Sequence, residues 1–323
     1  MRLAATLAVV VALTVPVGAD AVGPYPDLGD CSVFPDPPAS LSPRAPSLPN
    51  QAAWNQDISK APVARNSTAV ISYIDSQGGD FLHPDFGSPR PYGFPYAVVS
   101  AGQPFLPIHY TAYGSESDRG PFPVPTNAPV EGGRGSDGDR HVLTVDRSRC
   151  VLYELYRAFP QRDGGAHWNA DSGARWDLNS TALRPDSWTS ADAAGLPIFP
   201  GLVRYDEAAA GLVEHAIRVT FESTRDAWVH PASHCAGDSA SAPPMGMRLR
   251  LRAGYGLGGF SGPAKAIAEA LKSYGMIVAD NGSNWFFSGT SDRRWDDENL
   301  NQLKRIPGSA FQVVKSAART HVC

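Results

Sequence analysis

The carboxylates best placed to do chemistry lie in the central third of the chain, on or beside segments with the composition of strands. Glu154 lies within the run 151–156, where strand alternation puts it on the same face as Leu152 and Tyr156. Apolar neighbours disfavour the charged form of a carboxyl group, so we expect a raised pKa for Glu154. We also expect its side chain to point into a partly enclosed groove.

Two further acids follow aromatic residues: Asp177 comes after Trp176, and Asp206 comes after Tyr205. Hydrolysis of a glycosidic bond needs two carboxyl groups on opposite sides of the bond that is cut. We therefore predict that Glu154 acts with Asp177 or Asp206, one as general acid and the other as nucleophile or base. In the alternative interpretation each acid forms an ion pair with a nearby arginine, namely Arg140, Arg175, Arg204 or Arg218.

Aromatic and histidine side chains in the same stretch are candidates for substrate binding. Exposed tryptophan rings stack on sugar faces, so Trp168, Trp176 and Trp188 are expected to line a glycan cleft, unless at least two of them fill the ends of a sandwich. His141 begins the strand expected to pair with that of Glu154, and His215 begins another strand. Both histidines are counted as substrate-binding candidates.

Metal and thiol chemistry were considered from the remaining histidines and cysteines. His230 and His234 are four residues apart, and His215 or His83 with Asp85 would be needed to complete a site. Pro231 argues against a helix there, so the sequence predicts no metal site and no cofactor. The run Ser233-His234-Cys235 is similar to part of the L,D-transpeptidase motif, which leaves a cysteine- or metal-dependent peptidoglycan enzyme as a second alternative.

The elements that must position these residues are mostly short strands. Residues 141–145 and 151–156 flank a polar tetrad and predict a β-hairpin, and further strands are expected at 174–178, 201–205, 215–221, 227–229 and 247–252. The chain contains 31 glycines and 29 prolines spread along its length, which favours turns over helices. The predicted fold is mainly β: a sandwich or barrel of short antiparallel strands with a few C-terminal helices.

Helices are expected mainly in the last third, although residues 68–74 could form a short strand or helix. Ser261 can cap a helix that ends at Gly275, and another is predicted over residues 296–305. Between them, residues 276–279 and 285–287 flank Asn281-Gly282, a sequence typical of a tight turn, so a second hairpin is expected.

Export is the expectation at the N-terminus. Arg2, the apolar run 3–17 and the triplet Ala19-Asp20-Ala21 form a predicted signal peptide over residues 1–21. Residues 22–62 are rich in proline and predict an extended arm, and residues 63–323 predict a single β-rich domain. No stretch has the length of a membrane span, so we expect a secreted, extracellular monomer.

The four cysteines fit an oxidising compartment. Cys31 and Cys323 lie near the two ends of the mature chain, so we predict that they pair and that Cys150 pairs with Cys235. Three pairings of four cysteines are possible.

The charge balance excludes one class of partner. The chain has 28 basic and 32 acidic residues, a net charge of −4, and no basic cluster, so we expect no nucleic-acid binding.

Four segments carry a resemblance to a known group of proteins. They are Leu82 to Gly87, Gly138 to Leu143, Trp188 to Glu207 and Tyr274 to Gly282. On these runs the chain resembles a widespread family of secreted bacterial proteins of uncharacterised function. The resemblance implies secretion and an association with machinery directed at polysaccharides, but it transfers no functional residue.

These observations predict a secreted carbohydrate-active protein, a polysaccharide hydrolase or lyase with paired carboxylates, whose partner is a polysaccharide or cell-wall glycan. The first alternative is a non-catalytic glycan-binding or cell-envelope protein of the same fold.

Overall fold

The computed structural model describes Leu28, Cys31 and residues 53–87 and 92–323. The predicted signal peptide and most of the proline-rich arm lie outside these residues. The last part of the arm, residues 53–62, packs on the body: the carbonyl of Trp54 accepts a hydrogen bond from Ala216, and the indole of Trp54 is buried. Among the described residues, no helix is long and apolar enough to cross a membrane.

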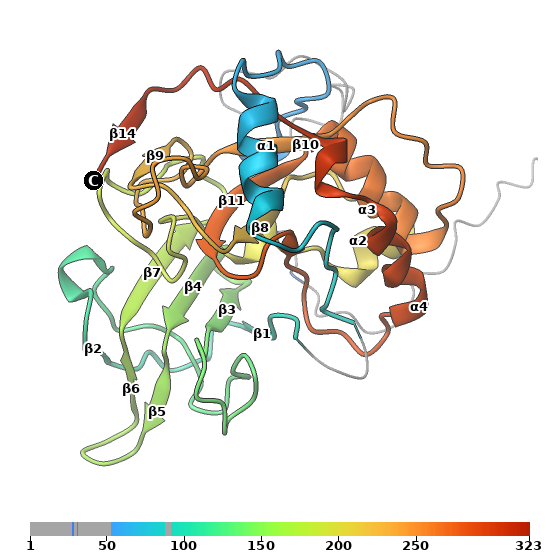
Figure 1. The fold of residues 1–323 in the computed structure, drawn as a ribbon. Helices are drawn as coiled ribbons and strands as arrows, with labels where there is room; N and C mark the ends of the chain where they lie inside the picture. Colours follow the sequence, from blue (N-terminus) through green and yellow to red (C-terminus); the bar gives the residue numbers. More distant parts are fainter. Residues whose placement is uncertain (1–27, 29–30, 32–52, 88–91) are drawn as a thin grey trace, which may run out of the picture.

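The first half of the fold is a four-stranded sheet in the order β1-β3-β4-β7 (Figure 1). Its strands are β1 (Tyr96–Val99), β3 (Val142–Asp146), β4 (Val151–Tyr156) and β7 (Ser172–Asp177). The predicted hairpin is confirmed, since β3 and β4 pair antiparallel with Leu143 opposite Glu154. Strand β1 joins β3 in parallel.

A small three-stranded sheet extends from the first one, in the order β2-β6-β5 (Figure 1). It consists of β2 (Ile108–Tyr110), β5 (Phe159–Gln161) and β6 (His167–Ala170). The indole of Trp168 on β6 is fully buried and donates a hydrogen bond to the carbonyl of Val124 at 3.0 Å. This tryptophan therefore belongs to the core beneath the loops.

The second half is built on a five-stranded sheet in the order β12-β8-β11-β10-β13. Its strands are β8 (Ile217–Phe221), β10 (Arg248–Leu251), β11 (Met276–Asn281), β12 (Phe286–Phe287) and β13 (Phe311–Val313). The predicted hairpin between β11 and β12 is wrong, because β8 lies between them, parallel to β11 and antiparallel to β12. After the Asn281-Gly282 turn the chain therefore crosses β8 and forms β12 on its far side, instead of pairing directly with β11.

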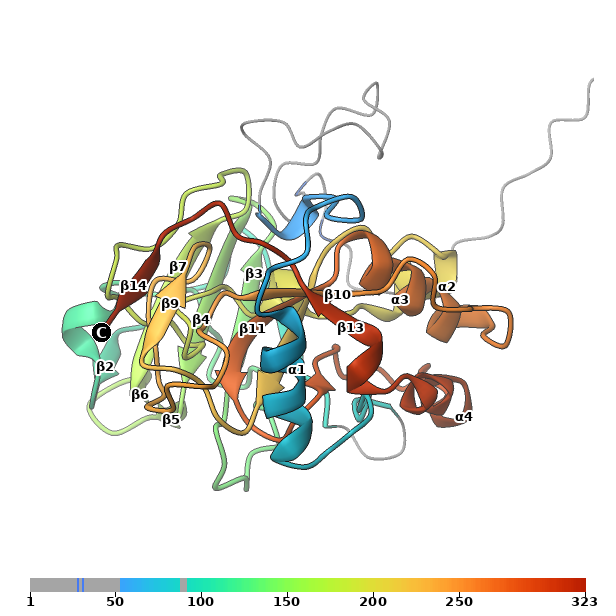
Figure 2. The same ribbon diagram turned by 45° about the horizontal axis from the view of Figure 1, so that its top comes forward.

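Four α-helices accompany this second sheet (Figures 1 and 2). The C-terminal helices were predicted correctly, whereas the strand expected at residues 201–205 is absent: a short 3-10 helix ends at Gly201 and an α-helix begins at Tyr205. The helices are α1 (Ser67–Ser76), α2 (Tyr205–Ala210), α3 (Gly262–Ser273) and α4 (Asp297–Leu300). Ala264, Ile267 and Leu271 share the buried stripe of α3, which packs against α2 and β10.

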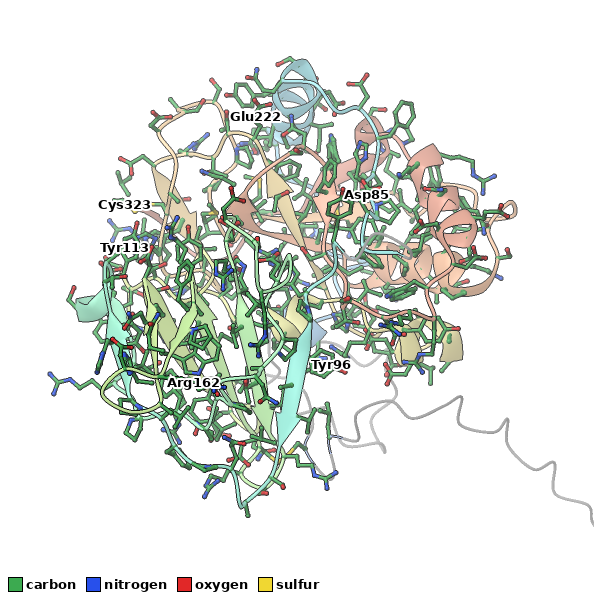
Figure 3. All side chains as sticks on the ribbon, turned by 90° about the horizontal axis from the view of Figure 1, so that it is seen from below. Asp85, Tyr96, Tyr113, Arg162, Glu222 and Cys323 are labelled. Atoms are coloured by element: carbon green, nitrogen blue, oxygen red, sulfur yellow. A yellow bond between two sulfur atoms is a disulfide. The ribbon has the colours of Figure 1, made fainter. Side chains whose placement is uncertain are left out.

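The fold is thus mainly β, as predicted, with several open sheets and no closed barrel among the described residues. The strands are not all antiparallel. The two halves meet beside β1, where Phe94 forms a β-bridge with Thr290. The ring of Tyr96, labelled in Figure 3, packs on Phe199 with the ring centroids 4.8 Å apart.

Two disulfides close the described chain, but not in the predicted pairing. Cys31 bonds to Cys150, with Cα atoms 5.2 Å apart, and Cys235 bonds to Cys323, with Cα atoms 6.6 Å apart. The C-terminal strand β14 (Thr320–Val322) runs to β9 (Ala227–Val229) and pairs with it, so Cys323 lies beside Cys235 and away from Cys31.

Candidate functional site

A group of charged side chains is buried between the two main sheets, and we name it the Arg218 cluster. Arg218 comes from β8 and His141 from the residue that precedes β3, and the carboxylates come from β11 and two loops. Its members are Arg218, His141, Glu131, Asp192 and Asp280. Burying charge is costly unless it is paired, and here nearly every charge has an opposite neighbour.

Arg218 is the centre of the cluster, and its side chain is only 3% exposed. One terminal nitrogen lies 2.5 Å from Asp192 Oδ1 and 3.3 Å from Asp280 Oδ2, and the other donates to the hydroxyl of Ser288 at 2.8 Å. The guanidinium also lies over the ring of Phe94. These contacts fix the plane of the guanidinium group and hold it charged.

His141 and Glu131 form the second pair. His141 Nδ1 lies 2.5 Å from Glu131 Oε2, and Nε2 lies 2.9 Å from the carbonyl of Ala191. Burial alone would lower the pKa of His141, but the Glu131 carboxylate outweighs burial and raises this pKa to about 9. In the resulting imidazolium both nitrogens donate, and the same pairing holds the pKa of Glu131 below its ordinary value in spite of burial.

Asp280 enters the cluster through an irregularity in the sheet. The pairing of β11 with β8 shifts between Val278 and Asp280, so Asp280 lies opposite Thr220. Thr220 and Arg218 share one face of β8, and a β-bulge of this kind turns a side chain toward that face. Burial, followed by repulsion from Asp192, raises the pKa of Asp280 to about 7.

Two of these carboxyl groups reach the surface. The side chains of Glu131 and Asp280 are 21% and 23% exposed, whereas that of Asp192 is fully buried. At neutral pH Glu131 is ionised, while Asp280 is partly protonated. Carboxyl groups whose environments displace their pKa values in opposite directions can serve as base and acid in one reaction. The cluster is therefore equipped for proton transfer.

Comparison of the chain with protein-family models, with curated proteins and with solved structures found no match.

Glu154, the first predicted catalytic residue, lies inside the protein and is fully buried. Its carboxylate accepts hydrogen bonds from the indole of Trp176 and from the backbone N–H groups of Ile198 and Phe199, at 2.9–3.1 Å. The expectation that it points into a groove is wrong, because the residues 198–199 cover it. Burial raises its pKa to about 7 in spite of these hydrogen bonds.

The other two predicted acids do not meet Glu154. Asp177 is exposed at the end of β7, opposite Val151, and strand alternation places it on the face of the sheet away from Glu154. Asp206 is exposed on the first turn of α2, in the other half of the fold. The structure thus does not assemble the predicted set of three carboxylates.

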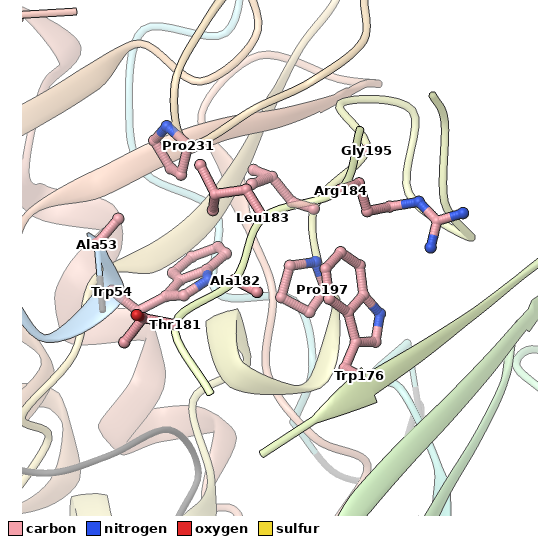
Figure 4. A pocket seen from close by; sticks show the side chains of 11 residues that line it. Ala53, Trp54, Trp176, Thr181, Ala182, Leu183, Arg184, Gly195, Pro197 and Pro231 are labelled. Carbon is pink, nitrogen blue, oxygen red and sulfur yellow. The ribbon is translucent and has the colours of Figure 1, made fainter. Parts of the chain in front are cut away.

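The predicted aromatic residues flank an arginine. The guanidinium of Arg184 lies 5.5 Å from the ring centroids of both Trp176 and Trp188. Trp176 also lines a pocket with Trp54 and the exposed Leu183, shown in Figure 4. Only 6% of Trp176 is exposed, so the expectation that its ring offers an exposed surface for sugar stacking is wrong: the indole packs inside and donates to the buried Glu154.

The two predicted histidines differ in their surroundings. His141 belongs to the Arg218 cluster, as described. His215 is buried elsewhere, where its Nε2 lies 2.9 Å from Glu207 Oε1 and its Nδ1 lies 2.8 Å from the carbonyl of Ala216. Glu207 also accepts a hydrogen bond from the backbone of Arg204, so His215 helps to fix the start of α2.

The metal and thiol alternatives weighed from the sequence involve residues that lie apart. His83 contacts Asp85, and His234 Nδ1 lies 2.9 Å from the carbonyl of Ala193. Cys235 is bonded to Cys323, so its sulfur is not a free nucleophile, which removes the thiol part of the peptidoglycan alternative.

Sequence reasoning missed four of the five members of the Arg218 cluster as site residues. Arg218 was considered only as a possible ion-pair partner of the predicted acids, and Asp280 only as part of a turn. One signal was available in the sequence, because Asp280 follows the apolar run 276–279. A carboxyl group at the end of a buried strand needs either a positively charged partner or a functional role. Glu131 lies in a glycine-rich loop without such a signal.

Proposed function

We propose that this protein is a secreted carbohydrate-active enzyme that hydrolyses glycosidic bonds at the Arg218 cluster. The observation that carries the proposal is the pair of partly exposed carboxyl groups in one cluster: the pairing with His141 keeps Glu131 ionised, whereas burial and the neighbouring Asp192 raise the pKa of Asp280. Two disulfides and the predicted signal peptide support export. The resemblance to secreted proteins associated with polysaccharides supports the substrate class.

The roles of the two carboxyl groups follow from their proton affinities. Asp280, with its raised pKa, gives a proton to the glycosidic oxygen as the bond from that oxygen to the sugar carbon breaks. Glu131 is ionised and acts at the sugar carbon, as a nucleophile or as the base that activates water. The ring of Tyr156 lies 5.4 Å from that of His141 and offers an aromatic surface beside the pair.

The test is incubation of the purified protein with a panel of polysaccharides, followed by an assay for new reducing ends. Asp280→Asn and Glu131→Gln should each lower the rate by about 100-fold or more, the usual effect of removing a general acid or base. Asp177→Asn and Asp206→Asn are matched controls, because both carboxylates are exposed, and they should retain activity. Thermal unfolding of each variant separates loss of catalysis from loss of fold.

The pH dependence gives a second readout of the same roles. Because Asp280 must be protonated, activity should decrease as the pH rises above about 7. Loss of activity in Asp177→Asn or Asp206→Asn, with full activity in Asp280→Asn, would refute the assignment to the Arg218 cluster.

The pocket in Figure 4 favours one alternative, a non-catalytic glycan-binding protein. Leu183 is 45% exposed at this pocket and lies over the buried indoles of Trp54 and Trp176, so its side chain is the apolar surface on which a sugar ring would pack. If no polysaccharide is cleaved, Leu183→Asp should abolish retention on an immobilised polysaccharide. Leu212→Asp is the control, because Leu212 is 61% exposed and does not line the pocket.

A further inference from the structure

Three side chains from distant parts of the sequence meet at the surface near the C-terminal strand. Asp186 lies in the loop after β7, His230 follows β9, and His321 lies in β14. One possible ligand atom from each residue lies within 4.8 Å of the corresponding atoms of the other two. Asp186 Oδ1 and His230 Nε2 are 3.6 Å apart.

The pairing of β9 with β14 explains why the two imidazoles converge. His321 lies opposite Trp228 in the register, and its ring stacks on the indole with centroids 3.9 Å apart. His230 is two residues after Trp228 and so faces the same side. The ring centroids of the two histidines are 5.5 Å apart. The disulfide from Cys323 to Cys235 holds β14 against β9.

The distance between His230 and Asp186 is unsuitable for an ordinary hydrogen bond and suitable for two ligands of one ion. A separation of 3.6 Å between His230 Nε2 and Asp186 Oδ1 is too long for a hydrogen bond. Two ligands that each lie about 2.0–2.2 Å from one ion in tetrahedral geometry are separated by roughly 3.4 Å. The other nitrogen of His230, Nδ1, is buried without a hydrogen-bond partner.

We propose that Asp186, His230 and His321 bind a divalent transition-metal ion, and that Zn²⁺ fits this set of ligands. Two imidazoles and one carboxylate are ligands that Zn²⁺ accepts, and three protein ligands leave a position for water or a bound molecule. His230 also lines a surface groove together with Arg248 and Lys315. A molecule that lies in this groove with an oxygen donor can therefore reach the ion.

This site is separate from the Arg218 cluster and shares no residue with it. The nearby group Asp226, Cys235 and Cys323 is not a competing site, because its two sulfurs are joined in a disulfide and cannot bind as thiolates.

The test is calorimetric titration of Zn²⁺ into the full, disulfide-bonded protein after treatment with a chelator. We expect one ion per chain, while Mg²⁺ and Ca²⁺, which prefer all-oxygen ligands, should not compete. Asp186→Asn, His230→Ala and His321→Ala should each weaken binding by about 10-fold or more, since even changes behind the ligands cost roughly 10–100-fold.

The chain provides a matched control in a second histidine pair. The rings of His109 and His167 are 4.6 Å apart, and no carboxylate joins them in a cluster among the described residues. His109→Ala should leave Zn²⁺ binding unchanged. His321→Ala removes a ring that packs on Trp228 and could weaken binding through a loss of stability. Asp186→Asn avoids this ambiguity, because the Asp186 side chain is 54% exposed and its replacement should leave the fold intact.

Absence of Zn²⁺ binding at neutral pH would overturn the proposal and leave an ordinary surface ion pair. Equal weakening by His109→Ala and His230→Ala would also overturn it, because binding would then be unspecific. A cobalt-substituted protein supplies an independent readout: its visible spectrum should lose intensity in Asp186→Asn and not in His109→Ala.

Discussion

The indole N–H of Trp176 donates a hydrogen bond to the carboxylate of Glu154 at 3.0 Å, inside the protein. The same carboxylate accepts the backbone N–H groups of Ile198 and Phe199. Glu154 thus connects β4, β7 and the turn before the short helix that contains Phe199. A carboxylate that satisfies three donors in the interior serves to fix the structure around it.

Replacement of Glu154 should therefore change stability. In Glu154→Gln one oxygen becomes an NH₂ group that faces donors, so we expect the free energy of unfolding to decrease by about 1–3 kcal/mol at pH 7. Urea unfolding measures this change. Asp177→Asn on the exposed face of the sheet is the control and should stay within about 0.5 kcal/mol. Equal stability of Glu154→Gln and wild type would contradict the role described for Glu154.

The pairing of His141 with Glu131 predicts a loss of stability in mild alkali. The pKa of His141 is raised to about 9 in the folded protein and is about 6.5 in the unfolded chain. The stabilising charge is fully present below pH 6.5 and is lost as the pH rises through 9. Between pH 7.5 and 9.5 the wild type should lose about 2 kcal/mol.

The range above pH 7.5 isolates this histidine, because the raised pKa values of Asp280 and Glu154 lie near 7. Unfolding by urea at pH 7.5 and 9.5 should show the loss in wild type and in His109→Asn, and not in His141→Asn. If His141→Asn lost as much stability as wild type, another group would be responsible.

Gly195, in the wall of the pocket of Figure 4, has a positive φ of 69°, and a Cβ there would lie 2.5 Å from the carbonyl oxygen of Trp188. Gly164 has the same φ but open space around it. Both alanine variants lose the freedom of glycine in this conformation, at a cost of about 1 kcal/mol. Only Gly195→Ala adds a clash, so its melting temperature should be clearly lower. Equal melting temperatures of the two alanine variants would show that the residues around Gly195 move to accept a Cβ without loss of stability.

The two disulfides predict a specific peptide map. Digestion without reductant should release one peptide pair that contains Cys31 bonded to Cys150 and another that contains Cys235 bonded to Cys323. The bonded cysteines are 119 and 88 residues apart in the sequence. Replacing both Cys31 and Cys150 by serine should lower the free energy of unfolding by about 2–5 kcal/mol. A peptide that joins Cys31 to Cys323 would contradict this connectivity.

The sequence was informative where interactions are local. The hairpin of β3 and β4 and the helix that begins after Ser261 depend on turn residues, alternation and capping within one short segment. The pairing of β11 with β8 and of Cys235 with Cys323 depends on segments far apart in the chain. Local patterns carry no information on which distant strand becomes a neighbour.

The same reason accounts for the candidate site. The sequence showed which residues neighbour Glu154 on its own strand. It did not show that residues 198–199, which are distant in the chain, cover the carboxyl group and exclude solvent from it. Arg218 and Asp280 meet only when β8 pairs with the distant strand β11, and Asp192 reaches them from a loop. The bulge that turns Asp280 toward Arg218 also depends on the partner strand. His141 was the one cluster member that its position in a hairpin could suggest.

The strand order of the second sheet has a consequence for the sequence of events during folding. Strands β3 and β4 are joined by a short turn and can pair early, whereas β8 obtains its neighbours β11 and β12 only after the chain has passed β9, β10 and α3. Such long-range pairing is slow, because the loop must close before any contact compensates for its entropy. Until then Arg218 is hydrated and Asp280 keeps the proton affinity of a free side chain. The Arg218 cluster is therefore expected to form among the last steps of folding, so a partly folded chain does not yet hold Glu131 and Asp280 in the surroundings that displace their pKa values.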